Sequence, residues 1–159
     1  MAVLRDYQTE VGSLVSTFQG TLERYSGDAV MVFFNDPVPI PNHVEQAVRM
    51  AVAMRARVGD LCNAWSKDGI ELGVGIGIAT GLATLGLVGF QDRHDYAAIG
   101  STTNLAARLC AEAKHRQILV SEPIAHLLQG IVEVEPVGPL KLKGIHREVR
   151  AYDIVRLKE

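Results

Sequence analysis

The chain has 159 residues, 48% of them hydrophobic and 21% charged, and a formal net charge of −2. This is enough apolar material for one globular domain with a core of its own. The near balance of charge gives no general reason to expect a nucleic acid or an anionic membrane as a partner. No apolar run reaches the length of a membrane span and no signal peptide is visible, so we expect a cytoplasmic domain without membrane contact.

Neither the cysteines nor the histidines form a metal-binding pattern. Cys62 and Cys110 lie far apart inside predicted helices, which is typical of reduced thiols in a cytoplasmic domain. The five histidines are scattered along the chain without the short spacings of a metal site. We therefore assign none of these side chains a role.

The first third of the chain predicts a helix, a hairpin and a second helix. Apolar residues repeat at helical spacing in the first segment, and Gly20 ends it. Gly27 and Asp28 mark a hairpin turn between two short strands. A longer helix follows a proline-rich loop. In chain order the expected elements are a helix over 2–19, strands over 21–26 and 29–34, and a helix over 43–66 capped by Asn42.

The next strand, expected over residues 72–79, has an unusual composition. A large aliphatic residue alternates with glycine or alanine along it, so one face is apolar and the other carries almost no side chain. Such a bare face invites close approach by another backbone, a helix or a partner. The glycines do not form a dinucleotide-binding fingerprint, because no helix opens at the required position. We expect residues 83–90 to form the returning strand and residues 91–94 a polar loop.

The second half of the chain predicts one more helix of note among short strands. Asp95–Ile99 reads as a strand, followed by a glycine turn and a helix that opens at Ser101 or Thr102 as its cap. The later elements are a strand over 117–120, a helix over 123–128, and strands over 132–137, 140–143 and 149–155. This alternation predicts an α+β domain with a mixed sheet and helices packed on one face.

Two polar side chains on the helix after Ser101 are the first candidates for chemistry. Asn104 and Arg108 are four residues apart and project from one face, while Leu105 and Leu109 mark the buried side. An amide beside a guanidinium suits a sugar and a phosphate. From spacing alone, the plainer interpretation is a surface helix whose Asn and Arg are solvated.

Asp28 is the second candidate. It sits at the hairpin tip beside Gly27, where a carboxylate can reach a ligand. A lone aspartate in a turn more often serves the turn itself, because its side chain bonds to the local backbone. The residue alone does not decide between these two roles.

Longer motifs favour the chemical interpretation. Asp95-Tyr-Ala-Ala-Ile-Gly100, followed by Thr103-Asn-Leu-Ala-Ala-Arg-Leu109, resembles the signature of class III nucleotide cyclase catalytic domains. Residues 22–34 resemble the other hallmark of that family, in the family's order and at about its spacing. With Leu140-Lys-Leu-Lys-Gly144 near the end, the resemblance covers nearly the whole chain.

The resemblance implies a single cyclase catalytic domain over residues 1–159, with a ferredoxin-like mixed or antiparallel sheet. It implies conversion of ATP to 3′,5′-cyclic AMP and pyrophosphate at the interface of a homodimer, with two Mg²⁺ or Mn²⁺ ions. Asp28 matches a metal ligand, Asn104 the residue that orients the ribose, and Arg108 the residue that stabilises charge at the α-phosphate. Lys143, or Lys141 in its place, matches a lysine that contacts the terminal phosphates; a surface lysine on an edge strand is the alternative.

Two positions that read the base depart from the family pattern. Adenylate cyclases usually carry Lys where this chain has Arg24 and Asp or Thr where it has Ala97, whereas guanylate-specific members tend to have Glu and Cys. An arginine can donate to adenine N1 or to guanine O6, and alanine reads neither. We expect ATP, on the ground that single-domain members of bacterial type are mostly adenylate cyclases, and GTP stays open.

The start of the family pattern is also missing. Family members begin with a strand carrying Phe-x-Asp-(Ile or Leu) and a Gly-Phe-Thr turn, which supply the second metal aspartate and a phosphate-binding turn. This sequence starts inside what resembles the helix after that strand, and Asp6 on that helix is a poor substitute. We therefore expect activity near the detection limit. The alternative function is a catalytically impaired relic that dimerises or binds nucleotide.

Overall fold

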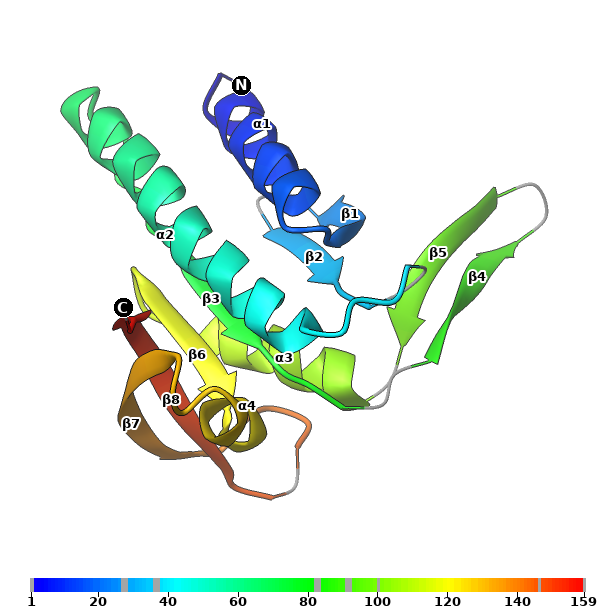
Figure 1. Cartoon of the computed structure of the whole chain (residues 1–159). Coiled ribbons are helices and arrows are strands. Elements are labelled where there is room, and N and C mark those ends of the chain that lie inside the picture. Colours follow the sequence, from blue (N-terminus) through cyan, green and yellow to red (C-terminus); the bar gives the residue numbers. More distant parts are fainter. Residues whose placement is uncertain are drawn as a thin grey trace.

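The computed structural model describes residues 2–26, 29–35, 38–81, 84–90, 93–99, 101–145 and 147–158, with the backbone alone at residues 2, 24, 26, 84–90 and 93–99. Its elements are α1 (Ala2–Thr17), β1 (Thr21–Ser26), β2 (Ala29–Phe33), α2 (His43–Lys67), β3 (Gly75–Ile78), β4 (Thr84–Phe90), β5 (Arg93–Ile99), α3 (Ser101–Glu112), β6 (Gln117–Ser121), α4 (Glu122–Leu127), β7 (Val132–Leu140) and β8 (Val149–Leu157) (Figure 1). None of the described helices is long and apolar enough to cross a lipid bilayer.

Among the residues that the structure describes, the strands form three sheets. The largest has the order β3-β6-β8-β7, with β3 parallel to β6 and the other pairs antiparallel. The strands β1 and β2 form one antiparallel hairpin, and β4 and β5 form another. The predicted α+β class with a mixed sheet is confirmed. The segment expected to return along β3 pairs with β5 instead, from Thr84 opposite Ile99 to Phe90 opposite Arg93.

Helices cover both faces of the four-stranded sheet. Ile118 and Val120 of β6 pack with α2 and α4 on one face. Leu119, between them in the sequence, points the other way and packs with Leu109 of α3. The sequence predicted helices on one face, and the structure differs in this respect. Three consecutive apolar residues in β6, instead of an alternation, give the strand two buried faces.

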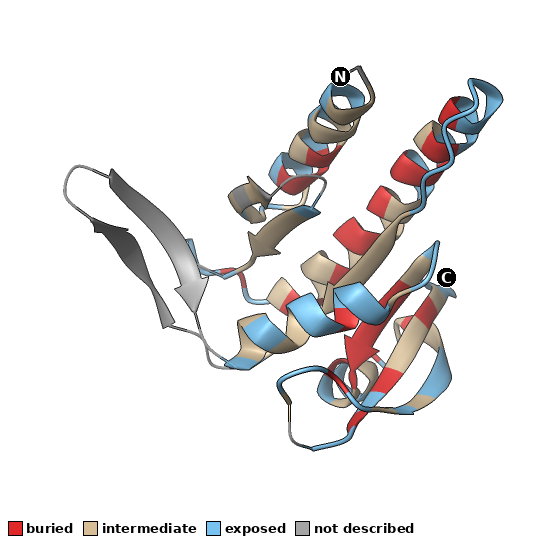
Figure 2. Ribbon diagram, turned by 180° about the vertical axis from the view of Figure 1, so that it is seen from behind, coloured by how far each residue is buried: buried red, intermediate tan, exposed pale blue. Residues whose placement is uncertain are grey.

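A second core holds the N-terminal half together. Val11, Leu14 and Val15 of α1 pack against α2, and partly buried residues of β1 and β2 join them. Figure 2 shows buried residues running along much of α2. One part of this helix packs on α1 and the N-terminal hairpin, and another part packs on the four-stranded sheet. The helix α2 therefore belongs to both cores.

Several predicted boundaries are wrong by a few residues. The helix α1 ends at Thr17, the glycine-rich strand starts at Gly75 instead of Leu72, and β5 starts inside the expected polar loop. Leu72 is half exposed, so burial of its side chain does little to favour a strand that starts there.

Two predicted helix caps and one strand break also need correction. Asn42 occupies the N-cap of α2 but makes no side-chain capping hydrogen bond. Ser101 is the first residue of α3, so the helix begins earlier than a cap at Ser101 or Thr102 would place it. The strand expected over 132–137 continues to Leu140, because register shifts at Glu133/Val134 and Pro136/Gly138 keep β7 paired with β8, whereas the strand expected over 140–143 does not form beyond Leu140.

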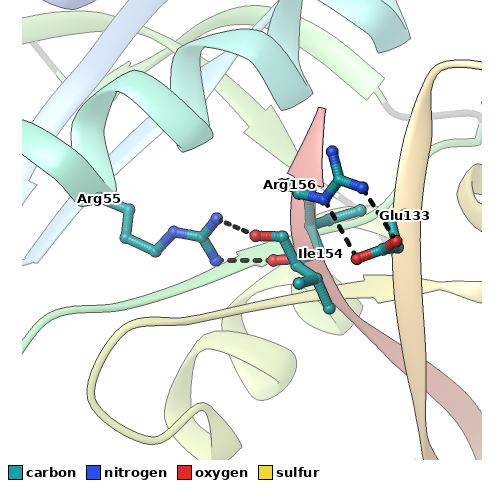
Figure 3. Close-up of polar contacts among 5 residues, drawn as sticks. Arg55, Glu133, Ile154 and Arg156 are labelled. Carbon is teal, nitrogen blue, oxygen red and sulfur yellow. Dashed lines mark hydrogen bonds and ion pairs between the residues drawn. The ribbon is translucent and has the colours of Figure 1, made fainter. Parts of the chain in front are cut away.

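Arg55 fixes α2 to the last strand. Its guanidinium donates hydrogen bonds to the carbonyl oxygens of Ile154, at 2.6 Å, and Val155, at 2.8 Å (Figure 3). Burial lowers the pKa of Arg55 from its ordinary value, and the nearby carboxylate of Asp153 opposes that shift. Beside this contact, Arg156 of β8 and Glu133 of β7 form an ion pair at 3.3 Å.

Candidate functional site

The glycine face of β3 is where α3 is seated. A methyl group built on Gly77 would overlap backbone atoms of Ala106 and Cys110 in α3, and one on Gly75 would lie 3.0 Å from Ala113. The bare face expected from the sequence therefore receives a helix at backbone distance. This contact fixes the height and rotation of α3 above the sheet.

The leucines of α3 set which of its faces looks outward. Leu109 is fully buried in a cluster with Leu119 and Ala151, and Leu105 packs against the same cluster. Asn104 and Arg108 are exposed, as the spacing predicted. Within the described part of the chain, neither of these two side chains has a hydrogen-bond or ion-pair partner, so both can receive a ligand.

The lysines after β7 are held next to the same helix. Lys141 and Lys143 are exposed, and Leu142 between them is only 4% exposed. Leu142 belongs to the cluster that contains Leu109 of α3. No role was expected for Leu142, although an apolar residue between two lysines is the signal of an anchored surface segment. One apolar cluster thus supports the elements that carry Asn104, Arg108 and Lys143.

For the remaining candidates, the structure describes the backbone alone or does not describe the residue. Arg24 is opposite Met31 in the β1–β2 hairpin, and Ala97 is opposite Gly86 in the β4–β5 hairpin. The strands β1 and β5 approach each other. Asp28 and the side chains of Arg24 and Ala97 lie outside the described residues.

Two polar contacts that support β3 and α3 were missed. The backbone N–H of Val74 donates to Nδ1 of His115 at 3.0 Å, just before β3. The backbone N–H of Arg116 donates to the carbonyl oxygen of Val74. These bonds tie the segment before β3 to the turn after α3. No sequence signal marks them, because the partners are some forty residues apart.

Comparison with known proteins gives the family. The family model described as "Adenylate and Guanylate cyclase catalytic domain" matches residues 1–156. Adenylate cyclase 1 of Rhizobium meliloti (strain 1021) is 32% identical over 158 residues, which cover 98% of this chain and 24% of that protein. An adenylate cyclase of Anabaena cylindrica is 30% identical over 132 residues, covering 79% of this chain and 25% of that protein. The chain thus spans about a quarter of the length of these relatives.

Solved structures agree with this result. The adenylyl cyclase CyaB from P. aeruginosa superposes with a TM-score of 0.90 at 33% identity, covering 98% of this chain and 81% of that one. The guanylyl cyclase Cya2 superposes with a TM-score of 0.91 at 25% identity, covering 99% and 81%. An adenylyl cyclase and a guanylyl cyclase therefore share this fold. By its sequence along almost its whole length and by its fold, the chain belongs to the adenylate and guanylate cyclase catalytic domain family.

Proposed function

We propose that residues 1–159 form one nucleotide cyclase catalytic domain that converts ATP to 3′,5′-cyclic AMP and pyrophosphate. The observation that carries the proposal is the outward-facing pair Asn104 and Arg108 on a helix seated at backbone distance on β3. A preorganised amide and guanidinium can act on a sugar and a phosphate without first giving up other partners. The similarity to adenylate cyclase 1 of Rhizobium meliloti over 98% of the chain supports ATP as substrate.

The proposed reaction is an intramolecular displacement at phosphorus. The ribose 3′-oxygen loses its proton and bonds to the α-phosphorus, while the bond from that phosphorus to the bridging oxygen breaks and pyrophosphate leaves. Asn104 orients the ribose, and Arg108 stabilises the negative charge that grows at the α-phosphate. Lys143 holds the terminal phosphates, with Lys141 as its substitute. Arg24 and Ala97 line the base.

The proposal includes divalent metal ions, with Asp28 as their one proposed protein ligand. Mg²⁺ or Mn²⁺ would polarise the α-phosphate and neutralise the triphosphate when bound. The described residues include no group of three or more His, Cys, Asp or Glu side chains that could hold a metal ion. Asp28, the proposed ligand, lies outside that part of the chain.

We further propose that the active form is a homodimer. Asp28 belongs to the β1–β2 hairpin and the Asn104–Arg108 pair to α3, and the family resemblance brings these parts together across a two-fold axis. Each site would then take its carboxylate from one subunit and its amide and guanidinium from the other.

A second candidate function is a cyclase relic that binds nucleotide without turning it over. Among residues 1–159, Asp28 is the aspartate that matches a metal ligand of the family pattern, so these residues taken alone would bind metal weakly. One carboxylate cannot hold two metal ions well.

A cyclase assay on a strand-complete chain distinguishes the two functions. The chain is extended at its N-terminus by a strand carrying Phe-x-Asp-Leu, and cyclic nucleotide is measured with ATP or GTP and Mg²⁺ or Mn²⁺. We expect product from the extended chain, loss of product in Asp28→Ala, and activity near the detection limit in the 159-residue chain. Asp6→Ala, which removes an exposed carboxylate of α1, is the matched control. Nucleotide binding without product in the extended chain would favour the relic.

A further inference from the structure

Arg116, in the turn between α3 and β6, has an unusual backbone conformation. Its φ of 69° lies in the left-handed region, which arginine adopts rarely because its Cβ crowds the backbone there. Its N–H donates to the carbonyl oxygen of Val74 at 2.6 Å, and its own carbonyl oxygen accepts a hydrogen bond from Nη1 of Arg55 at 3.3 Å. The residue is therefore fixed on both sides in a strained conformation, which is common where a protein holds a ligand.

The guanidinium of Arg116 lies face-on over Gly59 of α2. A methyl group built on Gly59 would lie 2.7, 2.8 and 3.0 Å from Nη2, Cζ and Nη1 of that arginine, and such similar distances mean that the plane of the guanidinium faces the helix. Gly59 is buried inside a 25-residue helix, where only proline is less favourable than glycine. Glycine at this point therefore weakens the helix but leaves room for a planar, charged group against its backbone.

The charge of Arg116 is not paired within the described part of the chain. No described carboxylate lies within ion-pair distance of its guanidinium, and the residue is exposed. The neighbouring Arg55 uses its donors on backbone carbonyl oxygens. Burial lowers the pKa of Arg55, the carboxylate of Asp153 opposes that shift, and the positive charge of Arg116 adds to it. Two positive charges thus lie close together, and the negative charge of Asp153 offsets one of them.

We propose that Arg116 and Arg55 form a binding site for an oxyanion of the phosphate class, on the surface between α2 and the start of β6. The Arg116 guanidinium binds two oxygens of the anion through neighbouring N–H groups, as a planar fork does with phosphate, and the charge of Arg55 adds attraction. Phosphate carries more negative charge than a carboxylate near neutral pH, so the excess positive charge attracts it more strongly. None of the residues of the proposed cyclase site takes part, so binding here can fail without bearing on that function.

An anion at this place links two parts of the structure that support α3. Arg116 belongs to the turn that follows α3, and its hydrogen bond to Val74 holds the segment before β3, the strand on which α3 is seated. Arg55 and Gly59 belong to α2. Because the anion draws charge from both sides, we expect its binding to stabilise the folded chain.

Titration of the 159-residue chain with inorganic phosphate tests the site. The parent protein carries Arg108→Ala and Lys143→Ala, because the proposed cyclase site also offers positive charge to phosphate. NMR spectra of the nitrogen-labelled protein follow the backbone amides of Gly59 and Arg116, with chloride at the same ionic strength as the reference. We expect saturable shifts of both amides, and a rise in the unfolding midpoint of about 3–6 °C when phosphate is present at ten times its dissociation constant.

Two variants separate the charge of Arg116 from its position. Arg116→Asn removes the charge, and asparagine tolerates a left-handed backbone, so the fold should be kept while phosphate binds at least about ten-fold more weakly. Gly59→Ala keeps both arginines but displaces the guanidinium; since alanine favours a helix, the protein should be at least as stable as its parent and bind phosphate more weakly.

Two further variants are the controls. Gly12→Ala, in α1, adds a methyl group that makes an ordinary contact of 3.5 Å with Oη of Tyr25, and it should leave phosphate binding unchanged. Arg57→Gln removes an exposed arginine of α2 that pairs with Glu10, and it should also leave phosphate binding unchanged.

Acetate and AMP identify what the site recognises. Acetate should bind more weakly than phosphate because its charge is smaller. AMP that binds as tightly as phosphate would show that the phosphate group is recognised wherever it is carried, and weaker binding of AMP would assign the site to the free anion; both results support the proposal. Unchanged phosphate binding in Arg116→Asn would overturn it. So would amide shifts that chloride reproduces at equal ionic strength, or acetate binding as tight as that of phosphate.

Discussion

Gly77 of β3 lies against the backbone of Cys110 in α3, with no room between them for a side chain. The position of the helix that carries Asn104 and Arg108 therefore depends on the absence of a methyl group in the strand below it. The contact that stabilises the fold here is also the one that positions the candidate site.

Gly77→Ala should destabilise the protein by about 1–3 kcal/mol, because the added methyl must push α3 away from the sheet. Thermal or urea unfolding followed by circular dichroism measures the change. Gly130→Ala is the control, since a methyl group there meets no atom within 4 Å, and its effect should stay within about 0.5 kcal/mol. Equal stability of the two variants would show that α3 does not rest on Gly77.

Arg55→Met should cost about 1.5–3 kcal/mol of folding free energy, because charge-assisted hydrogen bonds to the carbonyl oxygens of Ile154 and Val155 are lost. The midpoint of urea unfolding measures the loss. Arg57→Met, two residues along the same helix, removes only an exposed ion pair with Glu10 and should change stability by about 0–1 kcal/mol. A larger loss in Arg57→Met than in Arg55→Met would contradict this assignment.

Arg108→Ala in the strand-complete chain should lower kcat by about 100- to 1,000-fold with a smaller effect on KM, because the guanidinium acts on charge that develops in the transition state. Steady-state kinetics measure both constants. The side chain is exposed and has no partner among the described residues, so the unfolding midpoint should not move. Glu112→Ala, exposed at the end of the same helix, should keep normal kinetics. A rise in KM with unchanged kcat would show that Arg108 binds the substrate and the transition state equally well.

Arg24→Glu should shift preference toward GTP, and Arg24→Lys combined with Ala97→Asp should sharpen it toward ATP. A base hydrogen bond gained or lost in a dry site changes selectivity by about one to two decades. The ratio of kcat/KM for the two nucleotides, measured in the strand-complete chain, gives the shift. Changes well under tenfold in both variants would mean that these positions do not read the base.

Mixing two inactive variants tests the proposed dimer. Asp28→Ala and Arg108→Ala, each inactive alone in the strand-complete chain, should regain activity together, because a mixed dimer holds one intact and one doubly damaged site. At equal mixing, about half of the dimers are mixed and half of their sites are intact, so roughly a quarter of wild-type activity is expected. No recovery, with subunit exchange shown by a labelled chain, would place the whole site within one subunit.

The sequence predicted the elements of this fold better than their pairing. Periodicity located the helices of the described chain and most of its strands, because apolar spacing records which faces are buried. It could not show that β3 pairs with β6, because these strands are distant in the sequence and their pairing is set by tertiary packing. The helix on the second face was missed although residues 118–120 are consecutively apolar, which is the pattern of a strand buried on both faces.

The candidate site divides in a similar way. Asn104 and Arg108 were predicted by their spacing and are exposed as expected, since a helix fixes the faces of its own residues. The leucine between Lys141 and Lys143 indicates an anchored segment, but the contact of Leu142 with the cluster below α3 could not be predicted, because it joins elements distant in the sequence. The assignments of Asp28, Arg24 and Ala97 stay predictions.

The double membership of α2 in both cores has a consequence for how the molecule opens. If α1 and the N-terminal hairpin detach, α2 can stay on the sheet, where Arg55 and the apolar contacts of Val48 and Ala51 still hold it. Backbone amides of β1 and β2 should then exchange with solvent deuterium through a low-energy opening, whereas those of β6 and β8 should need nearly global unfolding. The backbone amides of the two halves would thus exchange at different rates, and those of α2 should exchange at the slower rate of the four-stranded sheet.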